Sequence, residues 1–380
     1  MALTAKRVEV PTSLLSRLAG VGFPQSRLGT VVESERHYID RAAFSKAHEK
    51  LTPEVMARLN AALRWGLIFT PSPDVCKGVF PPSQPMLLTD PDTYSAAPEG
   101  VTLAHYLTAM PEAEFHLRGM EEFSPERREL NLASVRFLQA LGMDVDFHAP
   151  FIHVFAKDTL FNISLRLLHA PYDTLGQSDP NAKFGIGEAG MDLYQSMVDF
   201  AAEARIGLFS FHATGAAKPY FTGTDFDAFA GKVRQIVDYA AARQVEVAVE
   251  TGGLSDDQHM ELFRRAGAGV LLDGVHYGVG VGGQKRDVLA FYERAGKEGV
   301  PVPLIHVGQS IDNGDSHTPL HITQADLPAG KVLDNFGLPQ LLRTVASEPR
   351  ANQSRIRFEI GPNGFESIVW LAQTVLGPLE

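Results

Sequence analysis

The sequence has a single cysteine, Cys76, among its 380 residues. One cysteine excludes a framework of disulfides and a zinc module built from several thiolates, so any metal must be held by histidine and carboxylate side chains. The sequence also lacks an apolar run of the roughly 18 residues that a membrane-spanning helix needs. Its N-terminus has no hydrophobic stretch of the kind found in secretory signals. We therefore expect a cytoplasmic protein without a membrane partner.

Basic residues are in the minority, with 34 Lys and Arg against 45 Asp and Glu and a net charge of −11. This balance excludes the broad basic surface with which many proteins contact nucleic-acid phosphates, although it leaves room for a small local patch. Hydrophobic residues make up 44% of the chain and charged residues 21%, a composition that is typical of globular enzymes and excludes a mainly disordered chain.

The N-terminal third differs from the rest of the chain in its proline content and in the pattern of its apolar residues. Residues 51–65 predict a helix with Thr52 as its N-cap and Pro53 in its first turn. Residues 71–98 contain seven of the 24 prolines, which predicts an extended connector because proline fixes φ and lacks a backbone donor. We interpret residues 1–110 as an extension that packs over the remainder of the chain.

From about residue 112, short apolar runs alternate with helical patterns, which is typical of repeated βα units. In the predicted helix 225–243, apolar residues recur every three or four positions. Asp225 suits the start of this helix because the helix dipole is positive there. This rhythm predicts an α/β fold, a (β/α)8 TIM barrel that spans residues 111–380.

Six predicted strands in succession end in a residue that can bind a divalent metal. They are LRLLH, LFSFH, VEVAVE, VLLD, PLIH and RIRFE, ending at His169, His212, Glu250, Asp273, His306 and Glu359. A polar residue at one strand end commonly caps a turn, but six in a row do not fit that interpretation. The C-terminal ends of barrel strands converge on one face, where active sites are built. The pattern therefore predicts a metal centre.

Two further pairs enlarge this set of donors: His276 follows Asp273 by three residues, and Asp315 and His317 share one loop. The predicted ligands are then His169, His212, Glu250, Asp273, His276, His306, Asp315, His317 and Glu359. Nine donors exceed what one ion needs, since zinc usually takes four. Imidazole and carboxylate donors without thiolate fit two or three zinc ions, with manganese or iron(II) as alternatives.

Residues 112–380 resemble the xylose isomerase-like TIM-barrel superfamily, and within it the apurinic/apyrimidinic endonuclease family 2, typified by endonuclease IV. The matching stretches are HAPY (169–172), FHATG (211–215), VAVETGG (247–253), LLDGVHYGVG (271–280), IHVGQS (305–310), DSH (315–317) and FEIGP (358–362). The resemblance implies three zinc ions, the first held by His169, His212 and Glu250, the second by Glu250, Asp273, His306 and Glu359, and the third by His276, Asp315 and His317.

The resemblance to endonuclease IV implies metal-dependent hydrolysis of a phosphoester, either in damaged DNA or in a small phosphorylated molecule. Three departures favour the small molecule. The loop VGQSIDNG at 307–314 is short, loops that intercalate into DNA are not recognisable, and residues 1–110 have no counterpart in that enzyme. The acidic net charge points the same way.

The alternative within the superfamily is a sugar isomerase or epimerase with one ion. That resemblance implies an ion held by Glu250, Asp273, His306 and Glu359, with His276 binding the sugar-like substrate. The two glutamates would then move a proton at the carbon next to a carbonyl. Glu250, Glu359 and His276 are accordingly the expected catalytic residues. An oxidative enzyme with several irons is a third alternative.

Two weaker signals remain. The glycine run at 278–283 satisfies a dinucleotide-binding pattern, but it starts too far beyond its strand and lacks a following acidic residue, so we interpret it as a barrel loop. His148, in the stretch DFHAPF, is predicted to be a polar residue at a strand end close to the metal centre.

Overall fold

The computed structural model describes residues 49–69, 110–117, 142–149, 188–213, 223–252, 254–279, 285–314, 316–359 and 364–379. It also describes scattered positions between 128 and 139 and two short paired strands, β1 (Arg36–His37) and β3 (Met86–Leu87). Two of the predicted ligands, His169 and Asp315, lie outside the described residues. Within the described ranges, none of the helices combines the length and the apolarity needed to cross a membrane.

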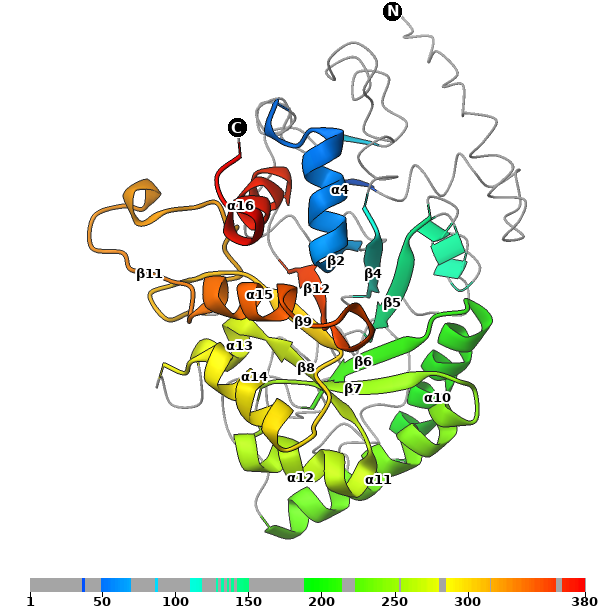
Figure 1. Cartoon of the computed structure of the whole chain (residues 1–380). Helices are drawn as coiled ribbons and strands as arrows, with labels where there is room; N and C mark the ends of the chain where they lie inside the picture. The colour runs from blue at the N-terminus through cyan, green and yellow to red at the C-terminus, as the bar shows by residue number, and fades with distance from the viewer. Residues whose placement is uncertain are drawn as a thin grey trace, which may run out of the picture.

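Eight parallel strands close into a barrel, which confirms the predicted α/β TIM-barrel fold (Figure 1). Neighbouring strands follow the order β12-β2-β4-β5-β6-β7-β8-β9 around the barrel. Their bounds are β2 Arg64–Phe69, β4 Glu112–His116, β5 Asp144–His148, β6 Leu208–His212, β7 Glu246–Glu250, β8 Gly269–Asp273, β9 Leu304–Val307 and β12 Arg355–Phe358.

Helices surround the strands (Figure 1). Their bounds are α4 Pro53–Ala62, α10 Glu188–Glu203, α11 Gly223–Ala241, α12 Asp256–Ala266, α13 Gly274–Val279, α14 Val288–Lys297, α15 Leu338–Ala346 and α16 Gly364–Leu376. After β9 the chain forms a small antiparallel pair, β10 (Ser310–Ile311) with β11 (Leu333–Asp334), and two 3-10 turns, η6 (Gln324–Asp326) and η7 (Arg350–Asn352). Helix α11 corresponds to the helix predicted at 225–243.

The barrel begins before residue 110, so the expected boundary between extension and barrel is wrong for residues 53–69. Helix α4 starts as predicted, with the Thr52 side chain accepting a hydrogen bond from the Val55 backbone N–H. The strand that follows, β2, pairs with β12 on one side and β4 on the other. Gly66 permits this close pairing, because a Cβ there would lie 1.9 Å from the Glu112 carbonyl oxygen. The remainder of the predicted extension lies almost entirely outside the described residues.

The strand next to β6 in the closed barrel is β5, which ends at His148 as the stretch DFHAPF predicts. β5 pairs directly with β6, with Phe147 opposite Phe209 and His148 opposite Ser210. The strand ending at His148 therefore lies directly beside the strand ending at His212. Residues 165–169 themselves lie outside the described residues.

The interior of the barrel differs between its two sides. Strands β6 to β9 contribute a small apolar cluster of Leu208, Ala248, Leu271 and Leu304. On the opposite side, the buried guanidinium of Arg357 donates to Glu112 at 2.8 Å and also contacts Asp146. We call these three residues the ionic cluster. A buried charge is costly unless it is paired, and here each charge has an opposite partner.

Side chains alternate between the two faces of a strand, so residues two positions beyond this layer also point inward. Two positions beyond the ionic cluster lie Glu114, His148 and Glu359. Two positions beyond the apolar cluster lie Ser210, Glu250, Asp273 and His306. The lower layer therefore forms a floor, and the polar residues above it gather at the C-terminal end of the barrel.

One histidine, His259 of α12, is buried between helices and belongs to none of these inward-facing positions. It is 2% exposed, and its ring stands edge-on to Phe291 of α14 at 5.9 Å. Neither ring nitrogen has a hydrogen-bond partner among the described residues. Burial, assisted by the positive charge of Arg286, lowers the pKa of His259 to about 3. The imidazole is therefore neutral in the folded protein at every pH above that value.

This burial predicts a pH-dependent loss of stability. At pH 5 the unfolded chain protonates His259 near its ordinary pKa of 6.5, whereas the folded protein does not. Stability is thus lost as pH falls below 6.5, by about 2 kcal/mol between pH 7 and pH 5. His259→Leu should remove this contribution, so the variant should gain about 2 kcal/mol over the wild type on going from pH 7 to pH 5. Urea unfolding at both pH values measures the difference, and an equal difference at both would contradict it.

Candidate metal centre

The C-terminal ends of the strands bring seven of the predicted ligands into the described site, and His148 joins them. Potential ligand atoms form three groups, and within each group they lie within 4.8 Å of one another. The groups are His148 with His212 and Glu250; Glu250 with Asp273, His306 and Glu359; and Asp273 with His276 and His317. We call them the first, central and third groups.

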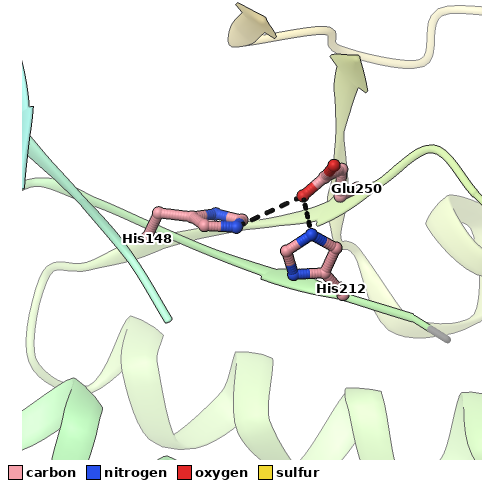
Figure 2. Close-up of side chains that lie close together, drawn as sticks. All are labelled: His148, His212 and Glu250. Atoms are coloured by element: carbon pink, nitrogen blue, oxygen red, sulfur yellow. Dashed lines mark ion pairs between the residues drawn. The ribbon is translucent and has the colours of Figure 1, made fainter. Parts of the chain in front are cut away.

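In the first group, two histidines point at one carboxylate oxygen (Figure 2). The Glu250 Oε2 atom lies 2.9 Å from His212 Nε2 and 3.2 Å from His148 Nε2. The other ring nitrogen of His148 lies 2.8 Å from the Ser210 hydroxyl, which holds the ring in this orientation. His148, predicted only to lie close to the centre, is therefore a candidate ligand beside His212 and Glu250, while His169 lies outside the described residues.

The central group gathers three carboxylates around one imidazole. His306 Nδ1 lies 2.7 Å from Glu359 Oε2 and 3.7 Å from Asp273 Oδ2. Asp273 is 1% exposed, and its Oδ2 atom has no hydrogen-bond partner among the described residues. Burying such an oxygen is costly unless something compensates it. A divalent cation among these donors would do so, and the donor set therefore fits a metal ion.

The third group depends on the segments that follow β8 and β9. Helix α13 begins directly after Asp273, whose carboxylate accepts a hydrogen bond of 2.5 Å from the His276 backbone N–H. The Nε2 atoms of His276 and His317 face each other at 3.2 Å, an arrangement that suits either a shared proton or a shared cation. His317 adopts a φ of 41°, a left-handed conformation that costs energy for a residue with a side chain.

The three groups share two carboxylates. Glu250 belongs to the first and central groups, and Asp273 belongs to the central and third. His276 strengthens the connection, because its Nδ1 lies 2.6 Å from Glu250 Oε1. Carboxylates have two oxygens and can join adjacent ions, so the arrangement could hold more than one divalent cation.

Burial and ion pairing shift the ionisation of the site in opposite directions. Burial favours the neutral form of Glu250, but contacts with His212, His148 and His276 hold its pKa well below the ordinary value. Asp273 has less compensation, so burial raises its pKa to about 6. Burial likewise opposes charge on His306, yet the Glu114 and Glu359 carboxylates raise its pKa well above the ordinary value. A metal ion must displace this proton, because only the neutral ring offers a lone pair.

Two inward residues of β4 were missed from the sequence. Glu114 Oε2 lies 2.9 Å from His306 Nε2, and the ring of His116 stands edge-on to His148 at 4.4 Å. The signal was present in the strand EAEFH, where Glu112, Glu114 and His116 occupy alternate positions. Polar residues at every second position of a buried strand face one side together.

Substitutions should separate the groups. Glu250→Gln should lose most of the bound zinc, since it weakens two groups at once, whereas His148→Ala should lose only the ion of the first group. His259→Leu is the matched control, a buried histidine that belongs to none of the three ligand groups, and should keep the wild-type zinc content. Elemental analysis after dialysis measures these ratios. If His169→Ala lowers the content while His148→Ala does not, the assignment of His148 is wrong.

No family model and no curated protein matches the chain. Solved structures with a similar fold include a xylose isomerase domain protein from Planctomyces limnophilus, 13% identical with a TM-score of 0.46, covering 73% of this chain and 95% of that chain. Another is the TTHB071 protein from Thermus thermophilus, soaked with ZnCl2, 14% identical with a TM-score of 0.48, covering 84% of this chain and 100% of that chain.

A third is a D-psicose 3-epimerase from Clostridium cellulolyticum with D-tagatose, 11% identical with a TM-score of 0.43, covering 72% of this chain and 90% of that chain. The closed barrel of eight parallel strands, given by the strand pairing of this chain itself, agrees with the fold that the resemblance implies. The closer resemblance to endonuclease IV stays a prediction.

Proposed function

We propose that the protein is a multinuclear metal-dependent hydrolase that acts on a phosphoester. The observation that carries this proposal is the sharing of Glu250 and Asp273 among three adjacent ligand groups. A site for one ion would need only the central group. The histidines of the first and third groups extend the donor set on either side of it.

The composition of each group is consistent with catalytic ions. The first and third groups each offer three protein ligands, the number that leaves a catalytic zinc ion one open position. Imidazole and carboxylate donors suit zinc, with manganese or iron(II) as alternatives. When bound, clustered divalent cations lower the pKa of water and stabilise negative charge on the attacking and leaving oxygens of a phosphoryl group.

Exposure indicates the side from which a substrate approaches. His317 is 20% exposed, His276 15% and Glu359 13%, whereas the His148 side chain is fully buried. Substrate therefore meets the third group first. There, His276 contacts Glu250 and can exchange a proton with it, while Glu359 is positioned by His306.

We propose a small phosphorylated molecule as the substrate, with damaged DNA as the alternative. The net charge of −11 works against a long polyanion, because binding such a ligand depends on many contacts between basic side chains and phosphates. A single phosphate group needs only local cations.

A second candidate is a sugar isomerase or epimerase with one ion in the central group. It is favoured by the 2.6 Å contact between His276 Nδ1 and Glu250 Oε1, through which a carboxylate orients this partly exposed imidazole. In barrel order Glu250 and Glu359 flank Asp273 and His306, so the two glutamates could serve as acid and base on either side of a substrate.

One substitution decides between the two candidates. The zinc- or manganese-loaded protein should hydrolyse p-nitrophenyl phosphate or bis-p-nitrophenyl phosphate, and abasic-site DNA and a panel of ketoses and aldoses should be assayed beside them. Loss of a ligand should cost at least as much as loss of its supporting partner, about 10–100-fold, so His317→Ala should slow hydrolysis by that factor or more. If sugars interconvert instead, at a rate that His317→Ala leaves unchanged, the hydrolase proposal fails and the isomerase takes its place.

A further inference from the structure

Glu114 meets a metal ligand from across the barrel. Its side chain is fully buried, and its Oε2 atom lies 2.9 Å from His306 Nε2, although 192 residues separate the two in sequence. Strands β4 and β9 are not neighbours, because β2 and β12 lie between them in the barrel. The contact therefore crosses the interior and does not follow from strand pairing.

We infer that Glu114 is a positioning residue for His306: it fixes the ring so that Nε2 carries the proton and Nδ1 is the atom presented to metal. The inference rests on metal binding by the central group, as the proposed function does. It assigns Glu114 no contact with substrate.

The choice of ring nitrogen follows from hydrogen-bond chemistry. An ionised carboxylate can only accept, so His306 Nε2 must donate to Glu114. In the neutral ring, the lone pair is then on Nδ1. That atom lies 2.7 Å from Glu359 Oε2 and 3.7 Å from Asp273 Oδ2, both of the central group. Partners of this kind orient metal-bound histidines and raise their basicity.

Comparison with Glu112, two residues earlier on the same strand, distinguishes this role from fold support. Glu112 pairs with two arginines, at 2.8 Å with Arg357 and 2.5 Å with Arg64, and so completes the ionic cluster. Among the described residues, the ion pairs of Glu114 are with histidines alone, His306 at 2.9 Å and His116 at 3.7 Å. The charge of Glu114 helps to raise the pKa of Arg357, but the direct contacts of this carboxylate are with imidazoles. Its value therefore lies in the imidazole that it orients.

The zinc affinity of the full-length protein, measured by competition with a chromophoric chelator, tests the inference. Glu114→Ala should weaken the affinity by about 10–100-fold. Glu114→Gln keeps an acceptor oxygen without the charge, so its affinity should fall between those of Glu114→Ala and the wild type. Glu112→Gln is the matched control: it should lower the stability toward urea and leave zinc affinity unchanged in the folded protein.

The ring nitrogens of His306 supply a second readout that a purely structural role would not move. In the zinc-loaded wild type, ¹⁵N spectra should show a protonated Nε2 and a metal-bound Nδ1. In Glu114→Ala, the Nε2 proton should exchange faster with solvent. Unchanged zinc affinity together with an unchanged Nε2 signal in Glu114→Ala would overturn the role of Glu114.

The two proposals fail separately. If zinc binding depends on Glu114 but the protein hydrolyses no phosphoester, the hydrolase proposal is wrong and the positioning role of Glu114 is retained. A wild-type protein that binds none of zinc, manganese and iron(II) would overturn both.

Discussion

Mutual repulsion among buried carboxylates is the constraint around which this site is organised. Glu250, Asp273 and Glu359 converge at the C-terminal end of one barrel, where Glu250 and Asp273 are fully buried and Glu359 is largely so. Without cations, the imidazoles around them supply the compensating charge and hydrogen bonds. The opposite pKa shifts of Glu250 and His306 express that compensation. Bound divalent ions would compensate the same carboxylates, and each ion would bring two positive charges to a single point.

The floor of the barrel lets the fold tolerate this concentration of charge. Beneath the site, strands β6 to β9 are closed by small and medium apolar side chains, while Arg357 neutralises Glu112 and Asp146 on the other side. The floor joins the strands through contacts that use none of the ligand side chains. The side chains above it are consequently placed by the barrel itself, and a ligand does not have to assemble them.

Much of the centre could be predicted from the sequence, because His212, Glu250, Asp273 and His306 stand at or near the end of apolar runs, and parallel strands converge at their C-terminal ends. The sequence predicted that His148 lies close to the centre, but not that it joins a ligand group. The letters HAP occur at both 148 and 169, and no local property of the sequence states that the first copy faces Glu250.

Two other features could not be predicted from the sequence, each for a different physical reason. The strand RWGLIF of β2 is short and precedes a proline-rich stretch, so its membership of the barrel depends on pairing with β12, a distant partner. Glu114 is the third residue of its strand and does not stand at the end. Glu114 matters because the barrel brings it to His306. The spacing of residues along the chain does not predict such a contact across the barrel interior.

The pairing of β2 with β12 also bears on the order of events in folding. Arg64 near one end of the described chain stands beside Arg355 near the other, so the barrel closes only when its last strand reaches its first. Contacts between such distant parts of a chain form slowly, because the loop entropy must be lost first. Glu359 follows directly on that last strand. Partly folded forms that lack β12 would therefore lack the complete donor set, and tight metal binding would be confined to the finished barrel.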